Sequence, residues 1–208
     1  LSNPMAINRG LATHEIAVAI LREYQRRRAA SDAFAEWYSI DPPFPDGCFG
    51  DDKLVAGAYV NGGIMPLVGG ELAHAAFAHG FEAYGLATLE QYRAMIAETG
   101  ETYLWYVPDG TPSTVDTSTS PEAMPTDGWG SSAMLYAFVE GLCGIQDQAH
   151  TYRRVRCAPR WAATDETTAS VQVGYAASDA RFGYDYAHDA DACTIRMTLN
   201  ADGADVAL

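Results

Sequence analysis

The feature that most constrains the fold of this chain is a change in its hydrophobic pattern close to residue 150. Before residue 145, apolar residues recur at helical spacing between long loops that are rich in glycine and proline. From about Thr151 onward, apolar and polar residues alternate as they do in half-buried strands. We therefore expect two domains: a helical domain over residues 1–148 and a small antiparallel β-rich segment over residues 149–208.

The helical region alternates between two kinds of helix. Residues 13–30 and 86–98 form amphipathic segments, with apolar residues on one stripe and charged residues opposite. Residues 66–80 and 131–142 are apolar nearly all round, which is typical of helices that are buried on most sides. Two concentric layers of helices require this alternation. The sequence therefore predicts a mainly α fold, the C-terminal part of an α/α toroid, followed by the β-rich segment.

Two long loops precede the apolar helices, over residues 31–63 and 102–130. Both are rich in polar and aromatic residues, and long loops inside a compact domain are usually functional. Because each loop leads into the N-terminal end of an apolar helix, we expect both to deliver side chains to one shared pocket.

The charge of the chain argues against some partners. Its 27 acidic and 13 basic residues give a formal net charge of −14. A chain this acidic repels phosphate backbones, so we expect no nucleic acid partner. The sequence also lacks an apolar run of the ~20 residues that a membrane span needs, so we expect no membrane partner. The compartment, cytoplasmic or secreted, stays open.

Metal and cofactor sites are not expected. The histidines form no HExxH motif, and the sequence has no P-loop and no GxGxxG motif. The four cysteines are widely spaced and contain no CxxC pair. Cys157 and Cys193 lie in expected strands, and whether they form a disulfide stays open.

An Asn-Gly-Gly turn (61–63) leads into the first apolar helix, which begins near Pro66. Glycine lets the backbone approach a ligand closely, Tyr59 suits stacking on the apolar face of a sugar, and Asn61 suits hydrogen bonds with hydroxyl groups. The same residues are also typical of a plain turn from loop to helix, so both interpretations stay open.

A second segment of the same kind precedes the last apolar helix. Asp127 is followed by Trp129 between two glycines and then by Ser131. Trp105, in the same loop, adds another flat ring. Trp129 and Trp105 are candidates for binding a sugar, although core packing would also explain each ring. Ser131 is a candidate contact as well, although a serine here would also cap the helix.

These segments resemble the last part of the six-hairpin glycosidase superfamily, which includes trehalase-like, glucosidase-like, rhamnosidase-like and cellobiose-phosphorylase-like enzymes. The resemblance is carried by the Asn-Gly-Gly turn (61–63), by the Gly-Trp-Gly-Ser-Ser segment (128–132), and by the Val-Glu-Gly-Leu-Cys-Gly-Ile exit (139–145) into a β-rich tail. It implies a toroidal fold and activity on carbohydrate by general acid/base catalysis.

The resemblance also implies two carboxyl groups that flank the glycosidic bond, one as acid and one as base. Trehalase-like relatives place the base ahead of the tryptophan-containing segment, which favours Asp127 or Glu122. Glu71, early in the first apolar helix, is a third candidate, although it would also brace its own helix. The acid comes from a middle hairpin of such enzymes, which this chain lacks.

The chain begins at Leu1, without an initiator methionine or a signal peptide. We interpret it as a piece of a longer protein, and the missing N-terminal part is an expected partner. The leading hypothesis is a glycoside hydrolase, or its C-terminal part, acting on an oligosaccharide or glycoside. The alternatives are a glycoside phosphorylase, a non-catalytic scaffold that binds carbohydrate, and a helical interaction domain.

Overall fold

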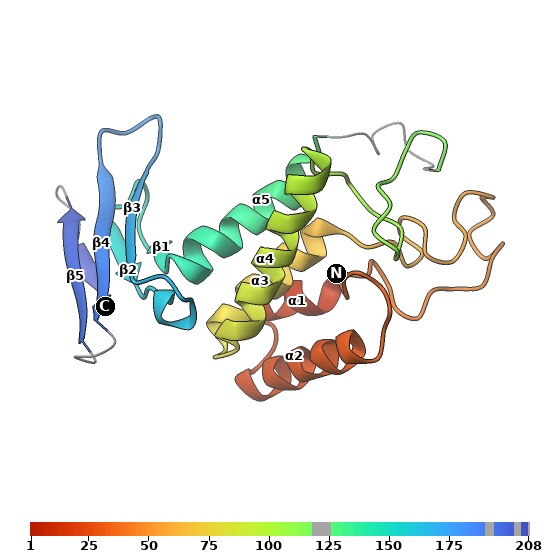
Figure 1. Cartoon of the computed structure of the whole chain (residues 1–208), viewed down its shortest axis with the longest axis horizontal. Helices are drawn as coiled ribbons and strands as arrows, with labels where there is room; N and C mark the ends of the chain where they lie inside the picture. Colours follow the sequence, from red (N-terminus) through yellow and green to blue (C-terminus); the bar gives the residue numbers. More distant parts are fainter. Residues whose placement is uncertain (118–125, 190–193, 202–204, 208) are drawn as a thin grey trace. The chain divides into compact units, whose positions relative to one another are not determined.

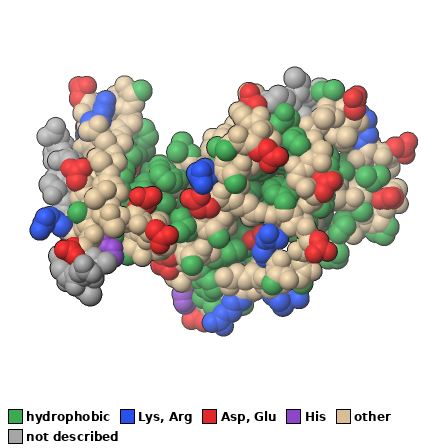
Figure 2. All heavy atoms as spheres, in the orientation of Figure 1, with side chains coloured by type: hydrophobic (Ala, Val, Ile, Leu, Met, Phe, Trp, Pro, Cys, Tyr) green, Lys and Arg blue, Asp and Glu red, His purple; other side chains and the backbone are tan. Residues whose placement is uncertain are grey.

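The computed structural model describes residues 1–117, 126–189, 194–201 and 205–207. The chain divides into two compact units, Leu1–Ala137 and Phe138–Leu208. The first unit is helical and the second contains the strands (Figure 1). Acidic side chains are spread over the visible faces of both units and do not gather in one patch (Figure 2).

The first unit contains five α-helices among its described residues. Thr13 accepts a hydrogen bond from the backbone N–H of Ile16 and so caps the second helix. Pro66 begins the third, where its missing N–H costs nothing, and Gly100 ends the fourth in a left-handed conformation. The helices are α1 (Ser2–Asn8), α2 (His14–Ala29), α3 (Pro66–Ala78), α4 (Glu82–Thr99) and α5 (Gly128–Tyr136).

Helix α3 is the centre of this unit. Eleven of its thirteen residues are buried, whereas α2 buries only Ala17 and Leu21. The other four helices all pack against α3. A helix that is apolar nearly all round needs neighbours on every side, which explains its central position.

Helices α3 and α5 touch through glycine. A Cβ on Gly70 would lie 2.3 Å from the carbonyl carbon of Ala133, and a Cβ on Gly130 would lie 2.6 Å from Cβ of Pro66. These pairs advance along both helices in the same direction. Helices α3 and α5 are therefore parallel, and they begin at the same end of the unit.

The two long loops meet at that end (Figure 1). Ile64 and Tyr106 exchange two backbone hydrogen bonds of 2.9 and 2.8 Å. Tyr38 also forms a bridge with Ile64, so that the first loop, the start of α3 and the second loop are tied together. Trp37 and Trp105 are buried beneath these bridges.

The second unit is built from two three-stranded sheets. One has the order β1-β2-β6, with β1 antiparallel and β6 parallel to β2. The other has the order β3-β4-β5 and is antiparallel throughout. A π-helical turn, η1 (Ala137–Leu142), and a short 3-10 helix, η2 (Trp161–Ala163), complete the unit. The strands are β1 (Ile145–Asp147), β2 (Arg154–Cys157), β3 (Thr168–Gly174), β4 (Arg181–Asp189), β5 (Thr194–Ala201) and β6 (Asp205–Ala207).

A buried chain of hydrogen bonds lies in the core of the second unit. The indole Nε1 of Trp161 donates to the hydroxyl of Tyr184 at 2.7 Å, and that hydroxyl donates to the carbonyl oxygen of Cys143 at 2.8 Å. Burial raises the pKa of the Cys143 thiol to about 12. These two hydrogen bonds join strand β4 to both η2 and the segment that follows η1.

The prediction of a mainly α toroid is wrong. The protein has a mixed α/β fold, with five helices and two small sheets in the described part of the chain. The prediction gave too much weight to the four helical segments, because the loops between them are long and have little regular structure. The predicted domain bounds, residues 1–148 and 149–208, stay a prediction.

Three further predictions concern bonds and partners. Cys48, Cys143 and Cys157 are free thiols, and Cys193 lies outside the described residues. No helix in the described ranges is long and apolar enough to cross a membrane. In the same ranges, no three His, Cys, Asp or Glu side chains converge in a way that suits a metal ion.

Candidate functional site

The first unit carries an open groove of about 450 Å³. Its floor belongs to α3, and its walls belong to the end of α1 and to α5. Because α3 and α5 are parallel and in close contact, side chains from the first turns of both helices reach the same groove. The residues that line it are Asn8, Arg9, Leu67, Glu71, Trp129, Ser132, Ala133 and Tyr136.

Trp129 gives the groove a large exposed ring. Its side chain is 66% exposed, whereas the other three tryptophans of the chain are buried. The glycines on either side allow this position, since Gly130 packs directly against Pro66 and no atom lies within 4 Å of a Cβ on Gly128. A flat apolar ring that meets solvent is a common contact for ligands.

Glu71 is held in the groove by two neighbours. Arg9 donates to both carboxylate oxygens of Glu71, from Nη2 to Oε1 at 2.8 Å and from Nη1 to Oε2 at 3.1 Å. The amide of Asn8 donates to Oε2 at 2.6 Å. Burial alone would raise the pKa of Glu71, but these hydrogen bonds and the charge of Arg9 hold that pKa below its ordinary value. Glu71 is therefore an ionised carboxylate in a fixed orientation.

His74, also on α3, contacts residues of both groove walls. Its ring stacks on Tyr136 at 4.3 Å between centroids and 20° between planes. Its Nδ1 lies 3.1 Å from Oδ1 of Asn8, an acceptor, because the amide nitrogen of Asn8 already donates to Glu71. The stack and this hydrogen bond join Tyr136 of α5 and Asn8 of α1 through His74.

This arrangement suits a saccharide. The exposed face of Trp129 matches the apolar face of a sugar ring. The carboxylate, guanidinium and amide of Glu71, Arg9 and Asn8 supply the acceptors and donors that hydroxyl groups need. The ion pair leaves little net charge in the groove, so a neutral ligand fits better than a charged one.

Asp127 and Ser131, predicted as catalytic and sugar-binding residues, both support α5. The carboxylate of Asp127 accepts hydrogen bonds from the backbone N–H groups of Trp129 at 3.3 Å and Gly130 at 2.7 Å. Asp127 is therefore the N-cap of α5. The hydroxyl of Ser131 donates to the carbonyl oxygen of Asp127 at 2.8 Å. Neither lines the groove.

Asn61, Tyr59 and Trp105 lie together in the loops and not in the groove. Asn61 is fully buried, and its side chain makes hydrogen bonds to the backbone of Phe44 and Leu54. The ring of Tyr59 lies 6.5 Å from that of Trp105, which is 1% exposed. These contacts brace the turn ahead of α3.

The structure thus brings two of the predicted residues, Glu71 and Trp129, into one groove. Glu122 lies outside the described residues. Asn8, Arg9 and Tyr136 were missed. No local pattern marks Arg9, because its partner Glu71 is 62 residues away in the sequence.

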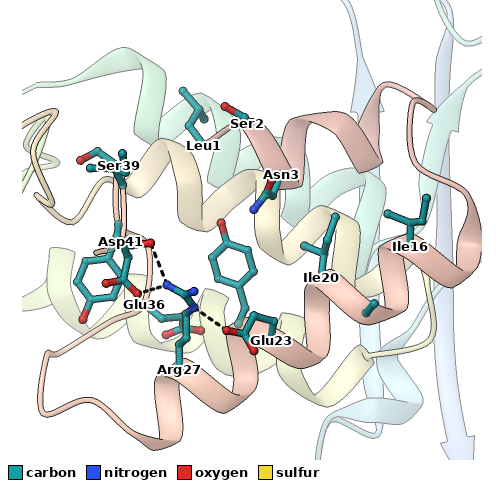
Figure 3. Close-up of a pocket in the computed structure, with 14 residues that line it drawn as sticks. Leu1, Ser2, Asn3, Ile16, Ile20, Glu23, Arg27, Glu36, Ser39 and Asp41 are labelled. Carbon is teal, nitrogen blue, oxygen red and sulfur yellow. Dashed lines mark hydrogen bonds and ion pairs between the residues drawn. The ribbon is translucent and has the colours of Figure 1, made fainter. Parts of the chain in front are cut away.

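A second cavity, of about 480 Å³, lies between α1, α2 and the start of the first loop (Figure 3). On its rim Arg27 binds Glu23 at 2.8 Å and Asp41 at 2.5 Å. Glu36 also lines it, accepts a hydrogen bond from the hydroxyl of Tyr84, and is 2% exposed. Burial raises the pKa of Glu36. None of the sequence-predicted site residues that the structure describes lines this cavity, so the groove is the stronger candidate.

Comparisons with known proteins give information on the fold alone. No protein-family model matches the chain, and no curated protein matches it. One similar solved structure is the GH78 family rhamnosidase of Bacillus sp. GL1, with a TM-score of 0.51 and 17% sequence identity. The likeness covers 68% of this chain and 14% of the rhamnosidase chain. It shows a shared fold over the matched part, which is a small part of that enzyme.

Proposed function

We propose that this chain is part of a glycoside hydrolase and that the groove between α1, α3 and α5 binds a saccharide. The observation that carries the proposal is the exposed ring of Trp129 beside the fixed carboxylate of Glu71. The fold shared with a rhamnosidase supports the same class of activity. Membership of the six-hairpin glycosidase superfamily stays a prediction.

In the proposed complex one sugar ring lies on Trp129. Its hydroxyl groups take the free lone pairs of Glu71 and the solvent-facing N–H groups of Arg9, whose side chain is half-exposed. Because Arg9 and Asn8 already fix the carboxylate, little side-chain entropy is lost when the sugar binds.

The state of Glu71 limits its chemistry. A carboxylate whose pKa is held low has no proton to give at neutral pH, so Glu71 does not fit the general acid of a glycosidase. It fits either a base acting on water or a group that orients the sugar. The catalytic roles predicted for Asp127, Glu122 and Glu71 all stay predictions.

Hydrolysis fits better than phosphorolysis. The N-terminus of α5 would be the natural place for a phosphate. Asp127 already accepts hydrogen bonds from two backbone N–H groups in the first turn of α5. The negative charge of Asp127 would also repel a phosphate. The second candidate is therefore a non-catalytic protein that binds carbohydrate, which is favoured because Glu71 is the one carboxylate among the described residues that line the groove.

Two assays on the full chain separate these functions. Calorimetric titration with L-rhamnose and short neutral oligosaccharides tests binding, and release of nitrophenol from a panel of aryl glycosides, the α-L-rhamnoside included, tests turnover. Binding that weakens about tenfold in Trp129→Ala supports the groove. Turnover in addition supports the hydrolase, and binding without turnover supports the second candidate. If Trp129→Ala binds every saccharide as the parent does, the proposal fails.

A further inference from the structure

The second unit carries a pair of stacked tyrosines that the groove does not use. The rings of Tyr152 and Tyr175 lie 4.9 Å apart between centroids with 21° between their planes. Tyr175 is 45% exposed and Tyr152 is partly buried, so the pair presents one ring face to solvent. We call these two residues the tyrosine platform.

The platform joins the turns of two different sheets. Tyr152 lies between β1 and β2, and Tyr175 directly follows β3. Core packing does not require this position, because the aromatic core of the unit is made by Phe182, Tyr184 and Trp161. An exposed stack that bridges two turns is therefore a feature in need of another explanation.

The loop that holds Tyr152 is strained. His150, Thr151 and Tyr152 have φ angles of 30°, 60° and 58°, three consecutive non-glycine residues in the left-handed region. Each such residue costs roughly 1 kcal/mol or more, and strain of this kind is concentrated at functional sites. Tyr152 is the last of these three residues, so the strained loop ends at the platform.

Hydrogen-bonding groups of both kinds surround the platform. Burial and then the nearby carboxylate of Asp147 raise the pKa of Tyr175. The guanidinium of Arg181 donates to the backbone carbonyl oxygens of Tyr175, Ser178 and Ala180. A carboxylate and a guanidinium thus lie near Tyr175, the guanidinium on its backbone.

We propose that the tyrosine platform is a second binding site, for a neutral saccharide. The exposed face of Tyr175 carries the apolar face of a sugar ring, and Asp147 and Arg181 bind its hydroxyl groups. Stacking of this kind gives affinity, and flanking polar groups give orientation. The site lies wholly in the second unit, so it stands or falls independently of the groove.

Charge decides between a neutral and a charged ligand. An anion would meet the carboxylates of Asp147 and Glu140, both of which act on the platform tyrosines. An organic cation would suit an aromatic face, but it would leave the donors of Arg181 unused. A polyol uses both the acceptor and the donor. The groove has the same combination, with Trp129 beside Glu71 and Arg9.

The test is a nuclear magnetic resonance titration of the isotope-labelled full chain with L-rhamnose, cellotetraose, xylotetraose and maltotetraose. Shifts at residues 147–153 and 174–181 with at least one of these sugars are expected. In Tyr175→Ala they weaken about tenfold, whereas Tyr175→Phe, which keeps the ring face, loses about threefold at most. Gln172→Ala, an exposed change on β3, is the matched control and binds as the parent does.

The outcomes separate the two sites. Loss of the platform shifts in Tyr175→Ala but not in Trp129→Ala supports the platform, whatever happens in the groove. Sugar shifts confined to the first unit overturn the platform and leave the groove standing. Tetramethylammonium is the cation probe, and shifts at the platform with this probe alone also overturn the proposal. So does a Tyr175→Ala variant that binds the sugars unchanged.

Discussion

Gly70 of α3 and Ala133 of α5 are in backbone contact, so close that a Cβ on Gly70 would lie 2.3 Å from the carbonyl carbon of Ala133. No side chain separates the two helices at this point. Glu71 and Ser132, beside the contact, line the groove. The distance between the floor of the groove and its α5 wall is therefore set by the absence of a side chain at residue 70.

This contact predicts the effect of one added methyl group. Gly70→Ala forces α3 and α5 apart, and overpacking of this kind costs about 1–3 kcal/mol. Urea unfolding measures the loss. Gly128→Ala is the matched control on α5, because its new Cβ has no atom within 4 Å, and it is expected to change stability by less than about 0.5 kcal/mol. Equal stability of the two variants would contradict the packing described.

The capping role of Asp127 gives a second prediction. Asp127→Ala removes the acceptor for two N–H groups of α5, so it is expected to cost about 0.5–2 kcal/mol of stability. Asp127→Asn keeps an acceptor oxygen and is expected to lose less than half of that. Thermal unfolding of both variants measures these two losses of stability. A catalytic Asp127 would give the opposite result: stability unchanged in Asp127→Asn, and glycoside turnover abolished.

Local pattern was enough to find the main helices and strands. The apolar run after Pro66 predicted a buried helix, and α3 is buried on all sides. The alternation of apolar and polar residues from about Thr151 onward predicted an antiparallel β-rich segment, and β3 and β4 pair antiparallel there. The fold class was wrong because such patterns mark elements but do not say how helices close around one another. The arrangement of the helices was therefore taken from the resemblance to the six-hairpin glycosidases, and the toroid that it implied is not the fold class of this chain.

The site was harder to predict for the same reason. Trp129 and Glu71 were identified, because an exposed ring between glycines and a lone carboxylate on an apolar helix are local signals. The pairing of Arg9 with Glu71 depends on the packing of α1 against α3 and has no local signal. Asp127 could have been recognised as a cap, since aspartate is preferred just before the first turn of a helix.

The pair of Glu71 and Arg9 predicts a pH dependence. The pKa of Glu71 is lower in the folded chain than the unfolded value of about 4.3. Its contribution to stability is therefore complete above that value and is lost as the pH falls through the folded pKa. Because Arg9 is half-exposed, the contribution is about 1 kcal/mol.

Urea unfolding between pH 6 and pH 3 tests this dependence. The parent chain is expected to lose more stability than Glu71→Gln over this range. Glu90→Gln, on an exposed part of α4, is the control and should follow the parent chain. Parallel curves for the parent and Glu71→Gln would show that the ion pair makes no difference to folding.

Two tyrosines of strand β4 provide a matched comparison in the second unit. Tyr184→Phe leaves the indole N–H of Trp161 and the carbonyl of Cys143 without the hydroxyl that joins them, at an expected cost of about 1–3 kcal/mol. The buried hydroxyl of Tyr186 has no hydrogen-bond partner in the described part of the chain. Tyr186→Phe is therefore expected to be neutral or stabilising in thermal unfolding. The reverse order of the two variants would contradict the assignment.

The most direct test of the saccharide groove uses the exposure of Trp129. The chain has four tryptophans, and the other three are at most 9% exposed, so acrylamide quenches mainly the fluorescence of Trp129. A saccharide that stacks on this ring is expected to protect it from quenching, with a midpoint equal to the calorimetric Kd. Leu135→Ala, a similarly exposed change on α5 outside the groove lining, should leave the protection intact, and Trp129→Ala should weaken calorimetric binding about tenfold. Calorimetric binding with no protection of Trp129 would contradict the account.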